Sequence, residues 1–157
     1  MVRLVPMTQA EFEAYLESAV REYAQAHLKA GDCEPDEALA LAQADYESLL
    51  PEGLATPHQH LFSIYAEGVA DPVGMIWYGS REHRGKKSAY IYDFNIVAGL
   101  RGKGHGAASL RALEETLRGL GIGRVSLNVM GWNTRAKALY ERCGYGVAGI
   151  GMTKLLA

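Results

Sequence analysis

The sequence contains little cysteine and no long apolar run, and these absences remove several classes of protein. Only two cysteines occur among 157 residues, so we expect no disulfide framework. Cysteine and histidine nowhere show the spacing of a metal site, so we expect no bound metal. No apolar segment approaches the roughly 20 residues that a membrane span needs. The chain does not begin with basic residues followed by an apolar segment, so we expect no signal peptide and a cytoplasmic location.

Neither sign of charge is in large excess. The formal net charge is −2, so no broad basic surface indicates a nucleic-acid partner, and nothing indicates a membrane partner. A hydrophobic share of 48% with 22% charged residues is ordinary for a soluble globular chain. The length is that of one domain with a sizeable core, so we expect a single domain over residues 1–157.

A strand pattern, a glycine-rich turn and a helix pattern follow one another near the middle of the chain. Residues 90–97 are rich in β-branched and aromatic side chains, which predicts a strand. Alternation predicts that Ile91, Asp93, Asn95 and Val97 share one face, and that Tyr90, Tyr92, Phe94 and Ile96 share the other. From residue 107 to residue 120, apolar residues recur every three or four positions, which predicts an amphipathic helix.

The turn between these two elements has the composition of an anion site. It consists of Arg101, Gly102, Lys103, Gly104, His105 and Gly106. Glycines let a backbone approach a ligand closely, and the first N–H groups of a helix carry about half a positive charge. The basic side chains of the turn add to that charge. We therefore predict that the backbone of this turn binds an anion, with a pyrophosphate as the natural ligand.

Three interpretations of this turn compete on the residues alone. A phosphate-binding P-loop needs Lys-Ser or Lys-Thr after its last glycine, but Ala107 follows Gly106 here. A dinucleotide fingerprint fits Gly102, Gly104 and Ala107, yet such domains begin with this unit and place an acid roughly 20 residues later. The predicted strand over residues 124–130 contains no acid. The third interpretation is a plain strand–turn–helix corner with solvated basic side chains.

Two segments of the chain resemble motifs of the GNAT superfamily of N-acetyltransferases. Residues 101–106 are similar to its (Arg/Gln)-x-x-Gly-x-(Gly/Ala) motif. Residues 133–145 are similar to its Asn-x-x-Ala-x-x-Leu-Tyr-x-x-x-Gly-(Phe/Tyr) segment. Both motifs occur in the right order, separated by a helix and a strand, which is more specific than either motif alone. The resemblance extends from residue 88 to the C-terminus.

The remaining elements follow from local patterns. We expect a strand over residues 3–6 and a helix that starts with a capping box of Thr8 and Glu11 and ends at Gly31. A second helix should start at Pro35, with Leu39, Ala42, Tyr46 and Leu49 on its inner face. Strands are expected over residues 60–67, 73–80 and 124–130, a helix capped by Asn133, and a final strand or hairpin over residues 145–156. This order predicts an α/β fold with a mixed sheet.

The resemblance implies a particular fold and co-substrate. The GNAT fold has a mixed, mostly antiparallel central sheet with splayed central strands and helices on both faces. Its co-substrate is acetyl-CoA, whose pyrophosphate would lie on the backbone amides of residues 101–106. Asn95 and Ile96 would pair with the pantetheine arm or the acetyl carbonyl, and Asn133 would contact the cofactor from the second helix. A homodimer is compatible with the resemblance.

The resemblance also implies catalytic residues. Tyr140 matches the general acid that protonates the leaving thiolate, a task that suits a phenol with a pKa near 10. Several relatives carry a glutamate as base where this sequence has Asn128, and an amide cannot accept the proton. Asp93 is the best alternative carboxylate, because burial beside the cofactor strand would raise its pKa. A water chain that ends on Asp93 could fill the same role, as could His83, and an acceptor amine of low pKa would need no base.

Two functions follow from these assignments. The first is an N-acetyltransferase that acts on a primary amine of a small molecule or peptide by direct attack on acetyl-CoA. The second is an acyl-CoA-binding module for sensing or regulation, without turnover. The presence of Tyr140 favours the enzyme, whereas the amide at Asn128 keeps the binding module open.

Overall fold

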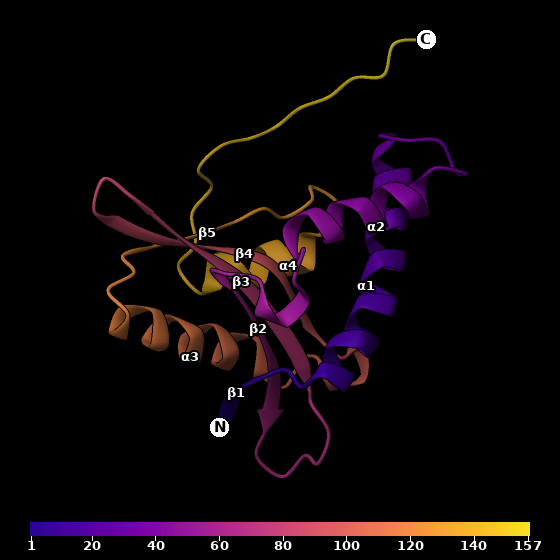
Figure 1. Cartoon of the computed structure of the whole chain (residues 1–157). Coiled ribbons are helices and arrows are strands. Elements are labelled where there is room, and N and C mark those ends of the chain that lie inside the picture. Colours follow the sequence, from indigo (N-terminus) through magenta and orange to yellow (C-terminus); the bar gives the residue numbers. More distant parts are fainter. The chain divides into compact units, whose positions relative to one another are not determined.

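The chain divides into two compact units. The computed structural model describes all residues from 1 to 157. The first unit comprises Met1–Pro6 and His58–Ala148, and the second comprises Met7–Pro57 and Gly149–Ala157. The elements in chain order are β1 (Val2–Pro6), α1 (Gln9–Ala30), α2 (Ala38–Leu49), η1 (Gly53–Ala55), β2 (Gln59–Ala66), β3 (Gly74–His83), β4 (Lys86–Ile96), η2 (Ala98–Leu100), α3 (His105–Gly119), β5 (Arg124–Leu127) and α4 (Thr134–Arg142), as Figure 1 shows.

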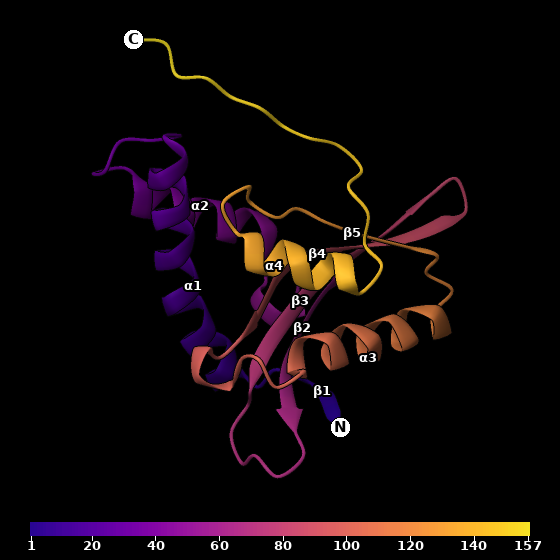
Figure 2. The ribbon, with the colours of Figure 1, turned by 180° about the vertical axis from the view of Figure 1, so that it is seen from behind.

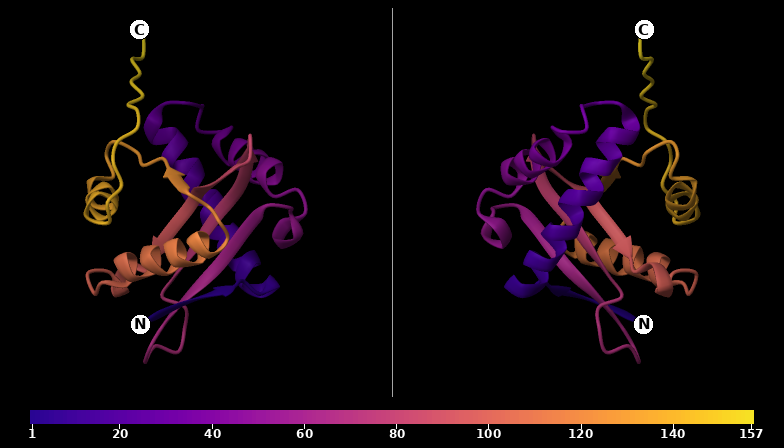
Figure 3. Two further views of the ribbon diagram at one scale, coloured as in Figure 1. Left: turned by 90° about the vertical axis from the view of Figure 1, so that its left-hand side faces the viewer. Right: turned by 90° about the vertical axis from the view of Figure 1, so that its right-hand side faces the viewer.

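The first unit is built on a five-stranded sheet in the order β1-β2-β3-β4-β5. The first three pairings are antiparallel, and only β4 and β5 run parallel. Helices α3 and α4 both pack on this unit's core (Figures 2 and 3). Leu110, Leu113 and Leu117 of α3 are fully buried with Ile64 and Ile76 of the sheet. The predicted mixed α/β fold is confirmed.

The two parallel strands separate part of the way along β4. Strand β4 pairs with β3 as far as Ile96, whereas it pairs with β5 only at residues 88–91. Residues 92–96 of β4 therefore have a strand on one side only. The splayed central strands expected from the resemblance are present, and they leave a length of backbone open on one side of β4.

A β-bulge lies at the point where the strands separate. Trp77 is opposite Asp93 while Tyr78 is opposite Ile91, so Tyr92 is an extra residue without a partner in β3. The extra residue reverses the side-chain alternation: Ile91 packs into the same core as Phe94 and Ile96. The prediction that Ile91 shares a face with Asp93 and Asn95 is therefore wrong, because simple alternation ignores the bulge.

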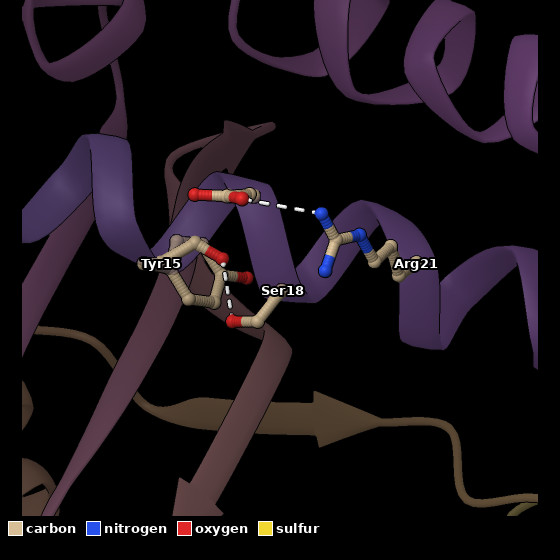
Figure 4. Close-up of polar contacts among 4 residues, drawn as sticks. Tyr15, Ser18 and Arg21 are labelled. Carbon is tan, nitrogen blue, oxygen red and sulfur yellow. Dashed lines mark hydrogen bonds and ion pairs between the residues drawn. The ribbon is translucent and has the colours of Figure 1, made fainter.

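The second unit contains the helical hairpin of α1 and α2. The predicted capping box is present: Thr8 and Glu11 exchange backbone-to-side-chain hydrogen bonds, and Gly31 ends α1 with a φ of 75°. On the exposed surface of α1, Ser18 Oγ donates to the carbonyl of Tyr15, and Arg21 pairs with Glu17 at 3.2 Å (Figure 4). Such exposed pairs contribute little to stability.

Helix α2 differs from its prediction in its start and in one residue of its inner face, since Ala42 is buried as predicted but Leu39 is not. It begins at Ala38, because residues 35–37 form a turn rather than the first helical turn. The buried residues are Ala38 and Ala42, which pack against Ala24 of α1, whereas Leu39 is half exposed. Small alanines allow a close approach of the two helices, and that contact decides the inner face more strongly than the positions of the leucines.

The C-terminal segment also differs from its prediction. Residues 145–157 form no strand or hairpin, and Figure 1 draws them as an extended chain after α4. Strand β5 is likewise shorter than expected, since it ends at Leu127. Glycines 146, 149 and 151 weaken a strand, and no neighbouring strand of the chain supplies backbone partners to this segment.

Candidate active site

The open side of β4 presents alternate backbone groups. The N–H of Val97 donates to the carbonyl of Val73 at 2.8 Å, so Val97 and, two residues earlier, Asn95 direct their backbone groups toward β3. Those of Phe94 and Ile96 consequently face the side from which β5 has departed. The N–H of Ile96 therefore faces the open side, whereas Asn95 could reach that side only with its side chain. The pairing of either residue with a cofactor stays a prediction. Phe94 was not among the predicted residues, because its role depends on the bulge.

Next to this open strand lies the start of α3. After β4 and η2, Gly102 and Gly104 have φ values of 76° and 83°, and Gly104 is the N-cap of the helix. No side chain caps the helix, so its first N–H groups point out of the turn. A Cβ atom at Gly102 or Gly104 would meet no heavy atom within 4 Å, which shows open space. This geometry is compatible with an anion site, and the binding of an anion by the turn stays a prediction.

The basic residues of the turn occupy different positions. Lys103 is exposed, and His105, the first residue of α3, is half-buried. The guanidinium of Arg101 turns back onto the end of β4: Nε donates to the carbonyl of Ile96 at 2.7 Å, and Nη2 donates to Asn95 Oδ1 at 2.8 Å. Arg101 therefore fixes the corner between β4 and the turn, a role for its side chain that the sequence did not indicate.

Gly106 differs from the other two glycines of the motif. A Cβ at Gly106 would lie 2.9 Å from Leu139 Cδ2 of α4, which is closer than real contacts. The absence of a side chain at Gly106 thus lets α3 approach α4. Its predicted contribution to cofactor binding stays a prediction, while its packing role follows from this contact.

The structure brings the two predicted catalytic residues together. Tyr140 projects from α4 and Asp93 from the open part of β4, and the Tyr140 ring lies near Phe94, with centroids 6.4 Å apart. Burial, and after it the negative charge of Asp93, raises the pKa of Tyr140 to about 12. The phenol is therefore protonated at neutral pH and can donate a proton.

Two asparagines flank the same region. Asn133 is the N-cap of α4, as predicted, and its Oδ1 accepts the N–H of Ala136 at 3.3 Å. A cofactor contact by Asn133 would therefore use its amide N–H groups. Asn128 follows the last residue of β5, and its backbone hydrogen-bonds the hydroxyl of Tyr90. The amide at this position supplies no carboxylate.

His83 is the last residue of β3 and lies far from the site. It pairs with Lys86 at the hairpin, about 20 Å along the strand from Asp93 at 3.3 Å per residue. This separation removes His83 as the direct base. In contrast, Gly74 opposite Ile96 is a residue that sequence reasoning could have marked: a Cβ there would lie 2.1 Å from the carbonyl oxygen of Asn95. Glycine inside a strand often indicates such a close approach.

The structure contains no group of three or more histidine, cysteine, aspartate or glutamate side chains placed to hold a metal ion. None of its helices combines the length and the apolar character needed to cross a bilayer.

Comparisons with known proteins agree with this geometry. The model of the acetyltransferase (GNAT) family matches residues 11–145. The chain is 37% identical over 155 residues to the uncharacterized N-acetyltransferase YycN of Bacillus subtilis, with 99% of each chain covered. It is 31% identical over 153 residues to YdgE of the same organism, which bears the same description, with 98% of this chain and 97% of YdgE covered.

The fold comparison leads to the same class. The crystal structure of YycN superposes with a TM-score of 0.93 at 36% identity and covers 100% of this chain and 99% of its own. The fold and the site thus define an acetyltransferase of the GNAT class. The protein belongs to the acetyltransferase (GNAT) family.

Proposed function

We propose that this protein transfers the acetyl group of acetyl-CoA to a primary amine of a small molecule or peptide, by direct attack of the amine on the thioester. The proposal is carried by three features together: the open side of β4, the uncapped start of α3, and Tyr140 of α4, whose ring lies near Phe94 of the open side. Each of these features fits one portion of the co-substrate.

The turn would hold the diphosphate. Backbone N–H groups of residues 102–106 are the donors, and the dipole of α3 favours the negative charge. The outward N–H groups of Phe94 and Ile96 would donate to amide carbonyls of the pantetheine arm, which would take the place of a neighbouring strand. Arg101 keeps this strand end and the turn in one arrangement through its bonds to Ile96 and Asn95.

The reaction requires proton transfers at both the acceptor nitrogen and the leaving sulfur. Acetyl-CoA supplies an activated acetyl group whose leaving atom is sulfur. The amine nitrogen forms a bond to the carbonyl carbon as the carbon–sulfur bond breaks, and Tyr140 donates its hydroxyl proton to the sulfur. A backbone N–H on the open side of β4 stabilises the charge that develops on the carbonyl oxygen. The nitrogen, which is cationic once bonded to the carbonyl carbon, releases a proton to solvent as the neutral amide forms. Tyr140, whose pKa is raised, regains its proton from solvent after each turnover.

Before the attack, the ammonium form of the acceptor must lose a proton. Asp93 is the carboxylate beside Tyr140, so we assign it as the base, directly or through a water molecule. A carboxylate in this position supports an enzyme over a module that only binds acyl-CoA. The nearby negative charge also favours a cationic acceptor.

The discriminating experiment is release of free thiol from acetyl-CoA with a panel of small amines and peptides, followed with a thiol reagent. An enzyme releases thiol only in the presence of an acceptor, and the acetylated amine accumulates in equal amount. Thermal stabilisation by CoA, without thiol release on any amine, would instead identify the acyl-CoA-binding module.

A further inference from the structure

The first unit contains a large cavity that lies apart from the candidate active site. Its volume is about 960 Å³, which is within the usual range for binding sites of small molecules. The hairpin of β3 and β4 and the end of α3 border it, and Figure 1 shows both at the left. Lys87 in its wall lies about 20 Å along β4 from Asp93. Every lining residue belongs to the first unit.

Aromatic rings form one part of the cavity wall. The imidazole of His60 stacks on the ring of Tyr78, with centroids 4.7 Å apart. Phe62 stacks on the same ring at 6.2 Å, so three rings from β2 and β3 are nearly parallel. Burial, and after it the charge of His58, lowers the pKa of His60, so its ring is neutral at pH 7. His60 is half-buried and lines the cavity, so a planar ligand can extend this stack.

The wall carries more positive than negative charge. Arg81 and Lys87 are cationic, and Glu82 is the one carboxylate in the lining. The guanidinium of Arg81 donates to Tyr92 Oη at 3.3 Å and is therefore already engaged. Lys87 forms no ion pair, not even with Glu82, which lies opposite it in β3. The ammonium group of Lys87 is thus available to an anionic ligand.

The cavity wall begins with a residue in an unusual backbone conformation. His58 has a φ of 65°, in the left-handed region that residues other than glycine rarely adopt. Its carbonyl accepts the N–H of Ser80 at 2.9 Å, which fixes His58 beside β3. Such conformations persist where the surrounding structure imposes them, and they are frequent at ligand sites.

The end of α3 contributes apolar side chains to the wall. Ile122 is buried, while Leu120 is 53% exposed. The N–H groups of Gly121 and Ile122 donate to carbonyls of the last helical turn at 3.0 Å, so few free carbonyls remain there to repel an anion. The cavity therefore combines an aromatic stack, an apolar wall and one available cation.

We propose that this cavity is a second binding site, for a small aromatic carboxylate whose ring extends the stack of His60 and Tyr78 and whose carboxylate pairs with Lys87. One available cation matches the single charge of a carboxylate, whereas a phosphate monoester carries nearly two. Leu120 and Ile122 offer apolar contact to the remainder of the ligand. The site does not overlap the proposed acetyl-CoA site, and ligand binding there does not depend on acetyl transfer.

The first test is a titration of isotope-labelled protein with 2-naphthoate, followed by two-dimensional amide NMR. We expect a dissociation constant of about 1 mM and saturable shifts of the amides of Ser80, Glu82, Lys87 and Leu120. 2-Naphthylmethylammonium has the same rings with the opposite charge and should bind about 10-fold more weakly. Cyclohexanecarboxylate keeps the charge without the flat ring and should also bind more weakly.

Charge variants test the role of Lys87. We expect Lys87→Gln to weaken 2-naphthoate binding about 4-fold, as for a partly solvated ion pair. Lys86→Gln is the matched control, because its neighbouring lysine is also exposed but does not line the cavity. Glu82→Gln removes the one carboxylate of the wall and should strengthen binding about 2-fold.

Ring variants test the stack. His60→Leu removes the ring and should weaken binding about 5-fold, whereas His60→Phe restores a ring and should bind nearly as well as wild type. The amide spectra show directly whether each variant folds. Equal binding by the two variants would reject the stacking role.

Three further results would overturn the proposal. The first is the absence of saturable shifts at the cavity up to about 10 mM 2-naphthoate, well above the expected dissociation constant. The second is 2-naphthylmethylammonium binding as tightly as 2-naphthoate, or Lys87→Gln binding as tightly as wild type. The third is a set of shifts confined to residues 102–106, which would place the carboxylate at the start of α3 instead.

Discussion

The two halves of β4 have the same neighbour on one side and different surroundings on the other. At residues 88–91 the strand lies between β3 and β5, whereas at residues 92–96 it pairs with β3 alone. The bulge at Tyr92 marks the boundary between the halves. The first half is ordinary sheet, and the second has backbone groups available to a ligand. The candidate site therefore exists because β5 stops pairing with β4 after residue 91. The free backbone of β4 is followed in the chain by the start of α3, which no side chain caps.

The largest expected effect is that of Tyr140→Phe, which removes the acid from the open half. We expect kcat to fall roughly 100-fold or more with little change in the KM for acetyl-CoA, within the usual range for general acids. Tyr145→Phe is the matched control, because its ring lies 5.7 Å from that of Tyr140 and its hydroxyl is also buried. Steady-state kinetics that show equal losses in both variants would contradict the assignment of Tyr140.

Asp93→Asn tests the base on the same half of β4. We expect kcat to fall about 50-fold, because an amide cannot accept the proton of the ammonium group. The pH–rate profile should also lose the limb on which activity rises with pH, because the group that titrates there would be absent. Asp71→Asn, in the turn between β2 and β3, is the control. If Asp93→Asn retains the wild-type limb, Asp93 is not the titrating base.

Gly74→Ala tests whether β3 alone holds the open half. The added Cβ would lie 2.1 Å from the carbonyl oxygen of Asn95, so β3 and β4 must move apart. We expect the free energy of unfolding to fall by about 2 kcal/mol in urea denaturation. Gly119→Ala at the end of α3 meets no atom within 4 Å and should change stability by only about 0.5 kcal/mol. Equal stability of the two variants would show that the close approach is unimportant.

Arg101→Lys separates positioning from charge in the turn. Lysine keeps the charge but loses the bonds to Ile96 and Asn95, so we expect CoA to bind about 10-fold more weakly in calorimetry. Lys103→Met removes an exposed charge instead, and its smaller effect should vanish as salt is added. The positioning role is wrong if the Arg101→Lys loss disappears in the same way at high salt.

The smallest effect concerns stability at alkaline pH. The pKa of Tyr140 is raised from its ordinary value of 10 to about 12 on folding, so the folded state holds this proton more tightly than the unfolded state. Its contribution to stability is complete below pH 10 and is lost as the pH rises to about 12. Thermal melts of wild type should fall more steeply over this range than those of Tyr140→Phe. Parallel curves would argue against the raised pKa.

Much of this architecture could be predicted from sequence because its signals are local. The capping box of Thr8 and Glu11, the cap at Asn133 and the glycines that end α1 and start α3 each act within a few residues. The bulge at Tyr92 has no such signal, because it depends on the register between β3 and β4. Simple alternation therefore placed Ile91 on the wrong face and missed Phe94.

The other differences depend on tertiary contacts. The bonds of Arg101 to the end of β4 join residues brought together by a turn, and the motif alone indicated a free charge. The segment of residues 145–156 has apolar residues typical of a strand, yet strand formation also requires a neighbouring edge. The burial of Ala38 and the exposure of Leu39 depend on the close contact of α2 with α1, which hydrophobic periodicity does not encode.

Amide hydrogen exchange in the presence and absence of CoA tests the central claim most directly. The amides of Phe94, Ile96 and residues 102–106 should exchange more slowly when CoA is bound, while those of the hairpin between β3 and β4 should not change. Protection confined to the hairpin or to residues 88–91, with the open half of β4 and the start of α3 unaffected, would contradict the account.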